Sequence, residues 1–158
     1  MDGVTKLYLE RAENELDVAN VVFAITSEHK LQKEVFHLEK TQTFYSAAIA
    51  HAYYCIFYSA KAYLHQHGVK TAPPEEHRKV FEALKQFVQD GTLDVELLRL
   101  YEELLLKADA LLDIFKAERK KRGEFTYQQI AQANREPAQQ SIKHARTFFT
   151  HTYRLLGK

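Results

Sequence analysis

The segment from Lys116 to Tyr127 holds the residues best suited to chemistry with phosphates and bases. Four consecutive cations occupy positions 119–122, and Phe125 and Tyr127 follow closely. Guanidinium and ammonium groups contact phosphates, and aromatic rings stack on bases. A structural interpretation competes with this one, because cations in the last turn of a helix stabilise its negative end and Gly123 suits the position just after it. On residue chemistry alone, the helix-end interpretation is the stronger of the two.

A second group of candidate residues forms a polar and aromatic stripe on the stretch 43–67. Its members recur at steps of three and four, and they are His51, Tyr54, Tyr58, Lys61 and His65. Residues at this spacing share one face of a helix. The stripe predicts either a helix side that faces solvent or a partner, or one wall of a shared site at a dimer interface.

Metal and cofactor chemistry find little support in the sequence. Glu34 and His37 match one Glu-x-x-His element of a di-iron bundle, but no second element is present. His51 and Cys55 lie one helical turn apart and could both bind a metal ion, but two ligands are too few for a zinc site. Neither a phosphate-binding loop nor a dinucleotide fingerprint occurs. Cys55 lies in an apolar helix and is interpreted as packing, so we expect no metal and no cofactor.

The elements that must position these residues are helices. Glycines and prolines concentrate at the joints, and the stretches between them carry apolar residues at helical steps. The predicted apolar faces are Leu9, Ala12, Leu16, Ala19 and Phe23; Ile49, Tyr53, Ile56, Ala60 and Leu64; Leu97, Tyr101, Leu104, Ala108, Leu111 and Phe115; and Ala138, Ile142, Ala145, Phe149 and Leu156. A shorter helix is expected from Pro73-Pro74-Glu75-Glu76 to about Gly91.

The sequence therefore predicts an all-α fold, an antiparallel bundle of four long helices plus a short helix, in a single domain over residues 1–158. The stretch 26–43 is left open between a short extra helix and an extension of its neighbours. The alanine-rich helix at 43–67 is placed at the centre, because small side chains allow close helix approach. It is expected, with the helix that opens at Asp94, to bury faces in a homodimer.

Composition limits the classes of function. The chain has 22 Lys plus Arg against 21 Asp plus Glu, a net charge of +1, so overall charge does not drive binding to a polyanion. No stretch is apolar enough to span a bilayer, and Met1 to Leu9 lack the pattern of a signal peptide. A single cysteine fits a reducing compartment. We expect a cytoplasmic protein with no membrane partner.

The order of these motifs resembles the HEPN domains of archaea and bacteria. The residues that carry the resemblance are Tyr8 to Leu16, the stretch Ala48 to Leu64 with its Ala-Tyr-Tyr-Cys-Ile-Phe, Gly68 followed by His77, and the Arg-containing turn at 119–127. Catalytic members of that family carry Arg, four intervening residues and His, and resemble metal-independent ribonucleases whose two motifs meet across a homodimer. Here the matching positions hold Arg122 and Tyr127, with Gly123 where the family has a polar residue.

This resemblance implies a homodimer with an RNA- or nucleotide-binding site near its two-fold axis, made by Arg122, Tyr127, Arg119 and Glu124. The stripe of His51, Tyr54, Tyr58 and Lys61 is expected to supply supporting contacts. A tyrosine with an ordinary pKa near 10 is a poor general base at neutral pH, so the ribonuclease site is read as degenerate. Two alternatives stay open: a metal-independent ribonuclease of the toxin–antitoxin kind, and a non-catalytic subunit that binds a minimal nucleotidyltransferase.

Overall fold

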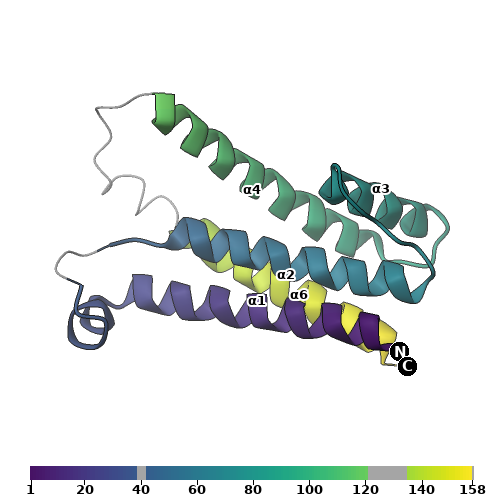
Figure 1. Cartoon of the computed structure of the whole chain (residues 1–158), viewed down its shortest axis with the longest axis horizontal. Helices are drawn as coiled ribbons and strands as arrows, with labels where there is room; N and C mark the ends of the chain where they lie inside the picture. Colours follow the sequence, from purple (N-terminus) through teal and green to yellow (C-terminus); the bar gives the residue numbers. More distant parts are fainter. Residues whose placement is uncertain (39–41, 121–134, 158) are drawn as a thin grey trace.

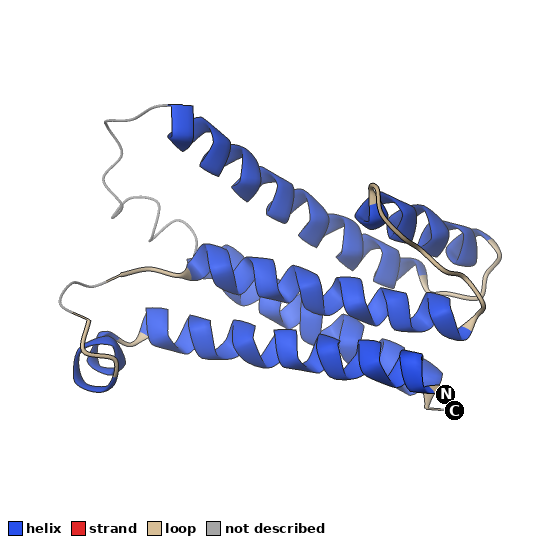
Figure 2. Ribbon diagram, in the orientation of Figure 1, coloured by secondary structure: helices blue, strands red, loops and turns tan. Residues whose placement is uncertain are grey.

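The computed structural model describes residues 1–38, 42–120 and 135–157, with the backbone alone for 108–120. Its elements are α1 (Gly3–Ser27), the π-helical turn η1 (Leu31–Val35), α2 (Tyr45–Gln66), α3 (Glu76–Gln89), α4 (Val95–Lys120) and α6 (Arg135–Leu156). All of these are helical, and no strand occurs among the described residues (Figure 2). The predicted all-α bundle is confirmed.

Helix α2 lies at the centre of the bundle. It packs against α1, α3, α4 and α6, and of its residues only Tyr54 and Gln66 are exposed (Figure 1). Buried alanines such as Ala48, Ala52 and Ala60 let the neighbouring helices approach closely. The apolar face predicted for this helix is therefore covered within one chain.

The other predicted faces also form the core. The buried members are Leu9, Ala12, Leu16 and Ala19 of α1; Leu97, Tyr101 and Leu104 of α4; and Ala138, Ile142, Ala145 and Leu156 of α6. Phe23 and Phe149 are half-buried against this core. The predicted positions Ala108, Leu111 and Phe115 lie where side chains are not described.

Local sequence explains where the helices start and stop. The Asp2 carboxylate accepts a hydrogen bond from the backbone N–H of Thr5 at 2.8 Å and so caps α1. Gly68 follows α2 with a φ of +79°, a left-handed conformation that costs glycine little. Helix α3 begins at Glu76, slightly later than the Pro73–Glu76 turn from which it was expected.

The stretch left open at 26–43 combines both expected forms. Helix α1 continues through Ser27, and the short turn η1 follows it. The buried amide of Gln32 holds this turn in place: its Nε2 donates to the carbonyl oxygens of Ile25 at 3.0 Å and Gln42 at 2.8 Å, and its Oε1 accepts from Gln42 N at 2.8 Å. One buried side chain thereby ties the connection back onto α1.

Candidate functional site

The cationic segment that the sequence singled out begins at the end of α4. Arg119 lies in the last turn of that helix, where only the backbone is described, and Arg122, Glu124 and Tyr127 lie outside the described residues. The chain leaves α4 at Lys120 and returns at Arg135 in α6, and both ends lie away from α3 and from the chain termini (Figure 1). The described helix ends that flank the candidate residues in the sequence thus lie at the same end of the bundle (Figure 1).

The stripe on α2 faces neighbouring helices of the same chain along most of its length. His51 Nδ1 lies 2.6 Å from the carboxylate of Glu15 in α1. His65 Nδ1 lies 3.3 Å from Thr5 Oγ1 and 3.5 Å from the Asp2 carboxylate. These contacts make both histidines part of the seam between α1 and α2.

Lys61, the lysine of the stripe, is also held internally. Its Nζ donates to Glu76 Oε1 at 2.5 Å, at the start of α3, and lies 4.7 Å from the centre of the Tyr8 ring. Burial alone would lower the pKa of Lys61, but hydrogen bonds to Glu76 and Tyr8 outweigh it and raise that pKa. Lys61 is therefore charged, but its charge is already paired with Glu76, which makes it a poor candidate for binding a phosphate.

Aromatic rings form the part of the stripe that stays accessible. Tyr54 and Tyr58 stack with ring centres 6.3 Å apart, and Tyr58 stacks on Tyr8 of α1 at 6.4 Å. The Arg11 guanidinium lies 5.0 Å from the centre of the Tyr58 ring, and Tyr54 is 39% exposed. This row of rings can stack on a base or a partner's side chain. Tyr8 and Arg11 are contributions from α1 that the pattern on α2 alone could not reveal.

His77 is a further residue that joins several helices. Its Nδ1 lies 2.5 Å from Tyr53 Oη of α2, and its ring centre lies 4.2 Å from that of Phe57. Its backbone carbonyl accepts a hydrogen bond from Tyr101 Oη of α4 at 3.4 Å. Burial raises the pKa of Tyr101, which stays a neutral hydroxyl. Through these contacts His77 joins α3 to α2 and α4.

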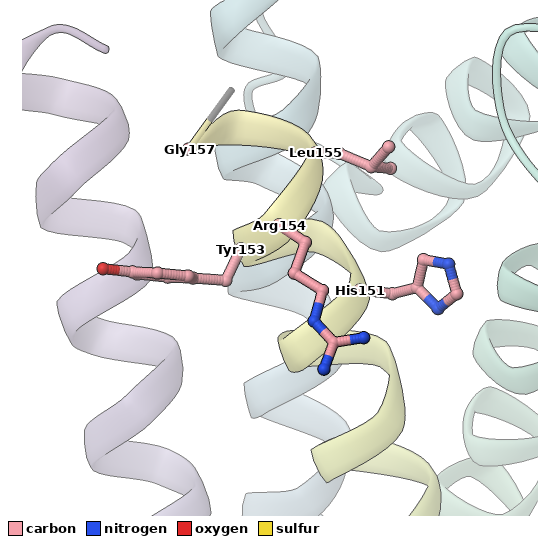
Figure 3. Close-up of a pocket in the computed structure, with 5 residues that line it drawn as sticks. All are labelled: His151, Tyr153, Arg154, Leu155 and Gly157. Carbon is pink, nitrogen blue, oxygen red and sulfur yellow. The ribbon is translucent and has the colours of Figure 1, made fainter.

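Two hollows lie on the described part of the chain. One, of about 450 Å³, is lined by His151, Tyr153, Arg154, Leu155 and Gly157 at the end of α6, and Figure 3 shows that its side chains point in different directions. Another, of about 190 Å³, is lined by Val4, Tyr8, Lys61, His65, Val69, Lys70 and Thr71. Within residues 1–38, 42–120 and 135–157, no three potential ligands lie close enough to hold a metal ion.

Cys55 is a buried free thiol on α2. Burial raises its pKa to about 12, so at neutral pH it is a protonated thiol and a poor nucleophile. This agrees with its interpretation as packing. None of the described helices is long and apolar enough to cross a membrane.

Comparison with known proteins identifies the class. The model of the HEPN domain matches residues 26–155, which include the central helix and the whole cationic segment. This chain belongs to the HEPN domain family, as the order of its motifs suggested. The match starts after most of α1, so the resemblance seen at Tyr8 to Leu16 lies outside it. Searches of curated proteins and of solved structures return no match.

Proposed function

We propose that this chain is a homodimeric RNA- or nucleotide-binding HEPN protein with a degenerate ribonuclease site. The observation that carries the proposal is the family match, which spans the segment with Arg119, Arg122, Glu124 and Tyr127. In this proposal Arg122 contacts a phosphate with its two-pronged guanidinium, and Tyr127 stacks or donates a hydrogen bond.

The contacts of the α2 stripe support the same assignment by elimination. The carboxylates of Glu15, Glu76 and Asp2 lie 2.6, 2.5 and 3.5 Å from His51, Lys61 and His65, so the basic side chains of the stripe are engaged within the chain. A binding surface for a phosphate backbone needs cations free to replace counterions. The run Arg119-Lys120-Lys121-Arg122 supplies four cations in consecutive positions, next to Phe125 and Tyr127. Phosphate contact is therefore assigned to this segment, and the stripe is left with stacking contacts at Tyr54 and Tyr58.

Loss of cleavage follows from the residue at position 127. A phenol with an ordinary pKa near 10 does not accept the ribose 2′-hydroxyl proton efficiently at neutral pH, whereas an imidazole does. The chain thus keeps the phosphate-binding half of the family's motif and lacks its base.

Two substitutions test the proposal with a labelled mixed-sequence single-stranded RNA as the probe. Arg122→Ala is expected to weaken binding several-fold, while Arg78→Ala, which removes a 75%-exposed arginine on α3, leaves it unchanged. Tyr127→His is expected to produce cleavage in EDTA that disappears when Arg122→Ala is added. Equal RNA affinity of the wild type and Arg122→Ala, with no cleavage from Tyr127→His, would refute the assignment and favour a purely protein-binding role.

A further inference from the structure

The charges of this chain are unevenly distributed along the sequence. The whole chain has 22 Lys plus Arg against 21 Asp plus Glu, yet residues 137–158 contain four Lys or Arg and no Asp or Glu. This stretch includes nearly all of α6, whose acidic residue is Glu136 in the first turn. A helix that only faces solvent usually carries charges of both signs, which pair along its surface. The single sign of charge on α6 points instead to a negatively charged ligand.

The cations of α6 gather on the side of the helix that faces away from the core. The core side holds Ala138, Ile142, Ala145, Phe148 and Leu156. Exposed residues on the opposite side recur at steps of three and four, and they are Arg135, Gln139, Lys143, Arg146, Thr150 and Tyr153, with Arg154 next to the last. We call these seven residues the outer face of α6. From Arg135 to Arg154 the outer face extends for about 28 Å along the helix.

The cations of the outer face are not neutralised within the described part of the chain. Lys143 and Arg154 form no ion pair with any described residue, in contrast to Lys61 of the α2 stripe. Arg146 donates a hydrogen bond to the amide oxygen of Asn20 at 3.2 Å, and this neutral partner leaves its charge uncompensated. Exposed cations of this kind displace counterions when a phosphate backbone binds.

Helix stability explains only part of this pattern. Arg154 lies in the last turn, where a positive charge is favourable next to the negative end of the helix dipole. Lys143 and Arg146 lie in the middle of α6, where the dipole gives no such advantage. They are three residues apart and therefore neighbours of like charge on the helix surface, with no carboxylate three or four residues from either. Their placement costs the free helix stability, which favours a role in binding.

An exposed aromatic ring completes the outer face at the end away from Arg135. Tyr153 is 53% exposed, and its ring lies against the half-buried ring of Phe149, with ring centres 6.0 Å apart. Figure 3 shows the side chains of Tyr153 and Arg154 extending away from the helix, and both border the hollow of about 450 Å³. A supported ring beside a guanidinium suits a base that stacks and a phosphate that follows it.

We propose that the outer face of α6 is a binding surface for single-stranded RNA that continues from the cationic segment. The inference rests on the proposed function and adds phosphate contacts along a helix that the structure describes. Helix α6 begins at Arg135, at the same end of the bundle as Lys120, the last residue of α4 (Figure 1). A strand bound at the cationic segment then follows α6 past Lys143 and Arg146 to Tyr153.

The composition of the outer face favours single-stranded RNA over other polyanions. A ring such as that of Tyr153 stacks on unpaired bases, which a duplex does not offer. An anionic membrane is a poorer match, because the outer face has no aliphatic side chain to insert between lipids.

Neutralising the middle of the outer face tests the phosphate contacts. Lys143→Gln/Arg146→Gln is expected to weaken binding of a labelled single-stranded RNA of about 16 nucleotides several-fold. The slope of log affinity against log salt should become shallower by about 1.4, because two fewer counterions are released. The matched control Arg78→Gln/Lys85→Gln removes two exposed cations of α3 and should change neither quantity. A Lys143→Gln/Arg146→Gln variant with the affinity and slope of the wild type would overturn the inference.

Two variants of Tyr153 test the stacking contact. Tyr153→Ala is expected to weaken binding of the same RNA about fivefold or more, whereas Tyr153→Phe keeps the ring and should bind like the wild type. A duplex RNA of the same length should be insensitive to both changes. Circular dichroism checks that each variant is folded. Equal binding of Tyr153→Ala and the wild type, or the same loss with the duplex, would overturn the assignment to single-stranded RNA.

Arg122→Ala separates this inference from the proposed function. If Arg122→Ala weakens RNA binding and the variants of the outer face do not, the inference fails and the proposed function stands. If the variants of the outer face weaken binding and Arg122→Ala does not, the inference stands and the role of Arg122 fails. Vesicles of phosphatidylcholine and phosphatidylserine give the remaining comparison. Vesicle binding that Lys143→Gln/Arg146→Gln abolishes, with RNA affinity unchanged, would assign the outer face to a membrane and overturn the inference.

Discussion

Lys61 and Glu76 form the ion pair that joins α2 to the first turn of α3, with Nζ and Oε1 2.5 Å apart and side chains 12% and 17% exposed. The hydroxyl of Thr71 donates to the same carboxylate oxygen at 3.2 Å. The lysine belongs to the stripe that the sequence offered as an interface. In the structure it holds two helices and their connecting loop together.

Breaking this pair should destabilise the fold. Lys61→Met is expected to lower the free energy of unfolding by about 1–2 kcal/mol, because it leaves a mostly covered carboxylate without its cation. The double variant Lys61→Met/Glu76→Gln should cost less than the sum of the single variants. Urea unfolding measures both. Arg99→Met, in the exposed cluster with Glu96 and Glu103, is the control and is expected to change stability much less, because solvent screens exposed ion pairs. Strictly additive costs would show that the pair is not coupled.

Gln32 should be the residue that fixes the connection between α1 and α2. Gln32→Ala removes an amide that bonds the backbone of Ile25 and Gln42, and it leaves these backbone groups without their side-chain partner. We expect a loss of about 2 kcal/mol in the free energy of unfolding and faster amide exchange at Gln42. Gln66→Ala, at an exposed position of α2, is the control. Unchanged exchange at Gln42 would contradict this role.

His144 should make stability depend on pH. Burial lowers the pKa of His144 below its ordinary value of 6.5, with cations at Lys107, Arg99 and Lys143 adding to this and Glu103 opposing it. Above pH 6.5 the residue is neutral in both states. Below it the unfolded chain binds the proton more readily, so the free energy of unfolding falls as the pH drops from about 6.5 toward the lowered pKa, and it levels off below that pKa, where both states are protonated.

The variant His144→Gln should lack this part of the acid destabilisation. Urea unfolding at pH 7.5, 6 and 5 is the measurement, and His151→Gln, at an exposed histidine of the same helix, is the control. A wild type and His144→Gln with the same loss of stability between pH 7.5 and 5 would exclude His144 as the source.

The sequence was sufficient for the helices and their buried faces, because apolar spacing reports directly which side of a helix is covered. Ile49, Tyr53, Ile56 and Leu64 are buried as that spacing predicts. It could not say which element covers a polar face. The stripe on α2 was predicted to face solvent or a partner, or to line a shared site. The sequence did not reveal that Glu15, Tyr8 and Glu76 of the same chain contact it, since contacts between distant residues leave no periodic signal.

The exposed aliphatic side chains of α1 illustrate a related limit. The spacing of Leu9, Ala12 and Leu16 is enough to predict that one face of this helix is buried. It does not predict whether apolar residues elsewhere on the helix are buried or exposed. Only the folded chain shows that Leu7 and Val21 are exposed. For the cationic segment, the residue types and the family match are the evidence, and Arg122 and Tyr127 lie outside the described residues.

The most direct test of phosphate binding by Arg122 is the salt dependence of RNA affinity. A plot of log affinity against log salt should become shallower by about 0.7 for Arg122→Ala, because one fewer counterion is displaced from single-stranded RNA. Arg122→Lys should keep the slope while recovering only part of the affinity, since an ammonium cannot make the two-pronged contact. The Arg78→Ala control should keep both. An Arg122→Ala slope and affinity equal to those of the wild type would contradict the account.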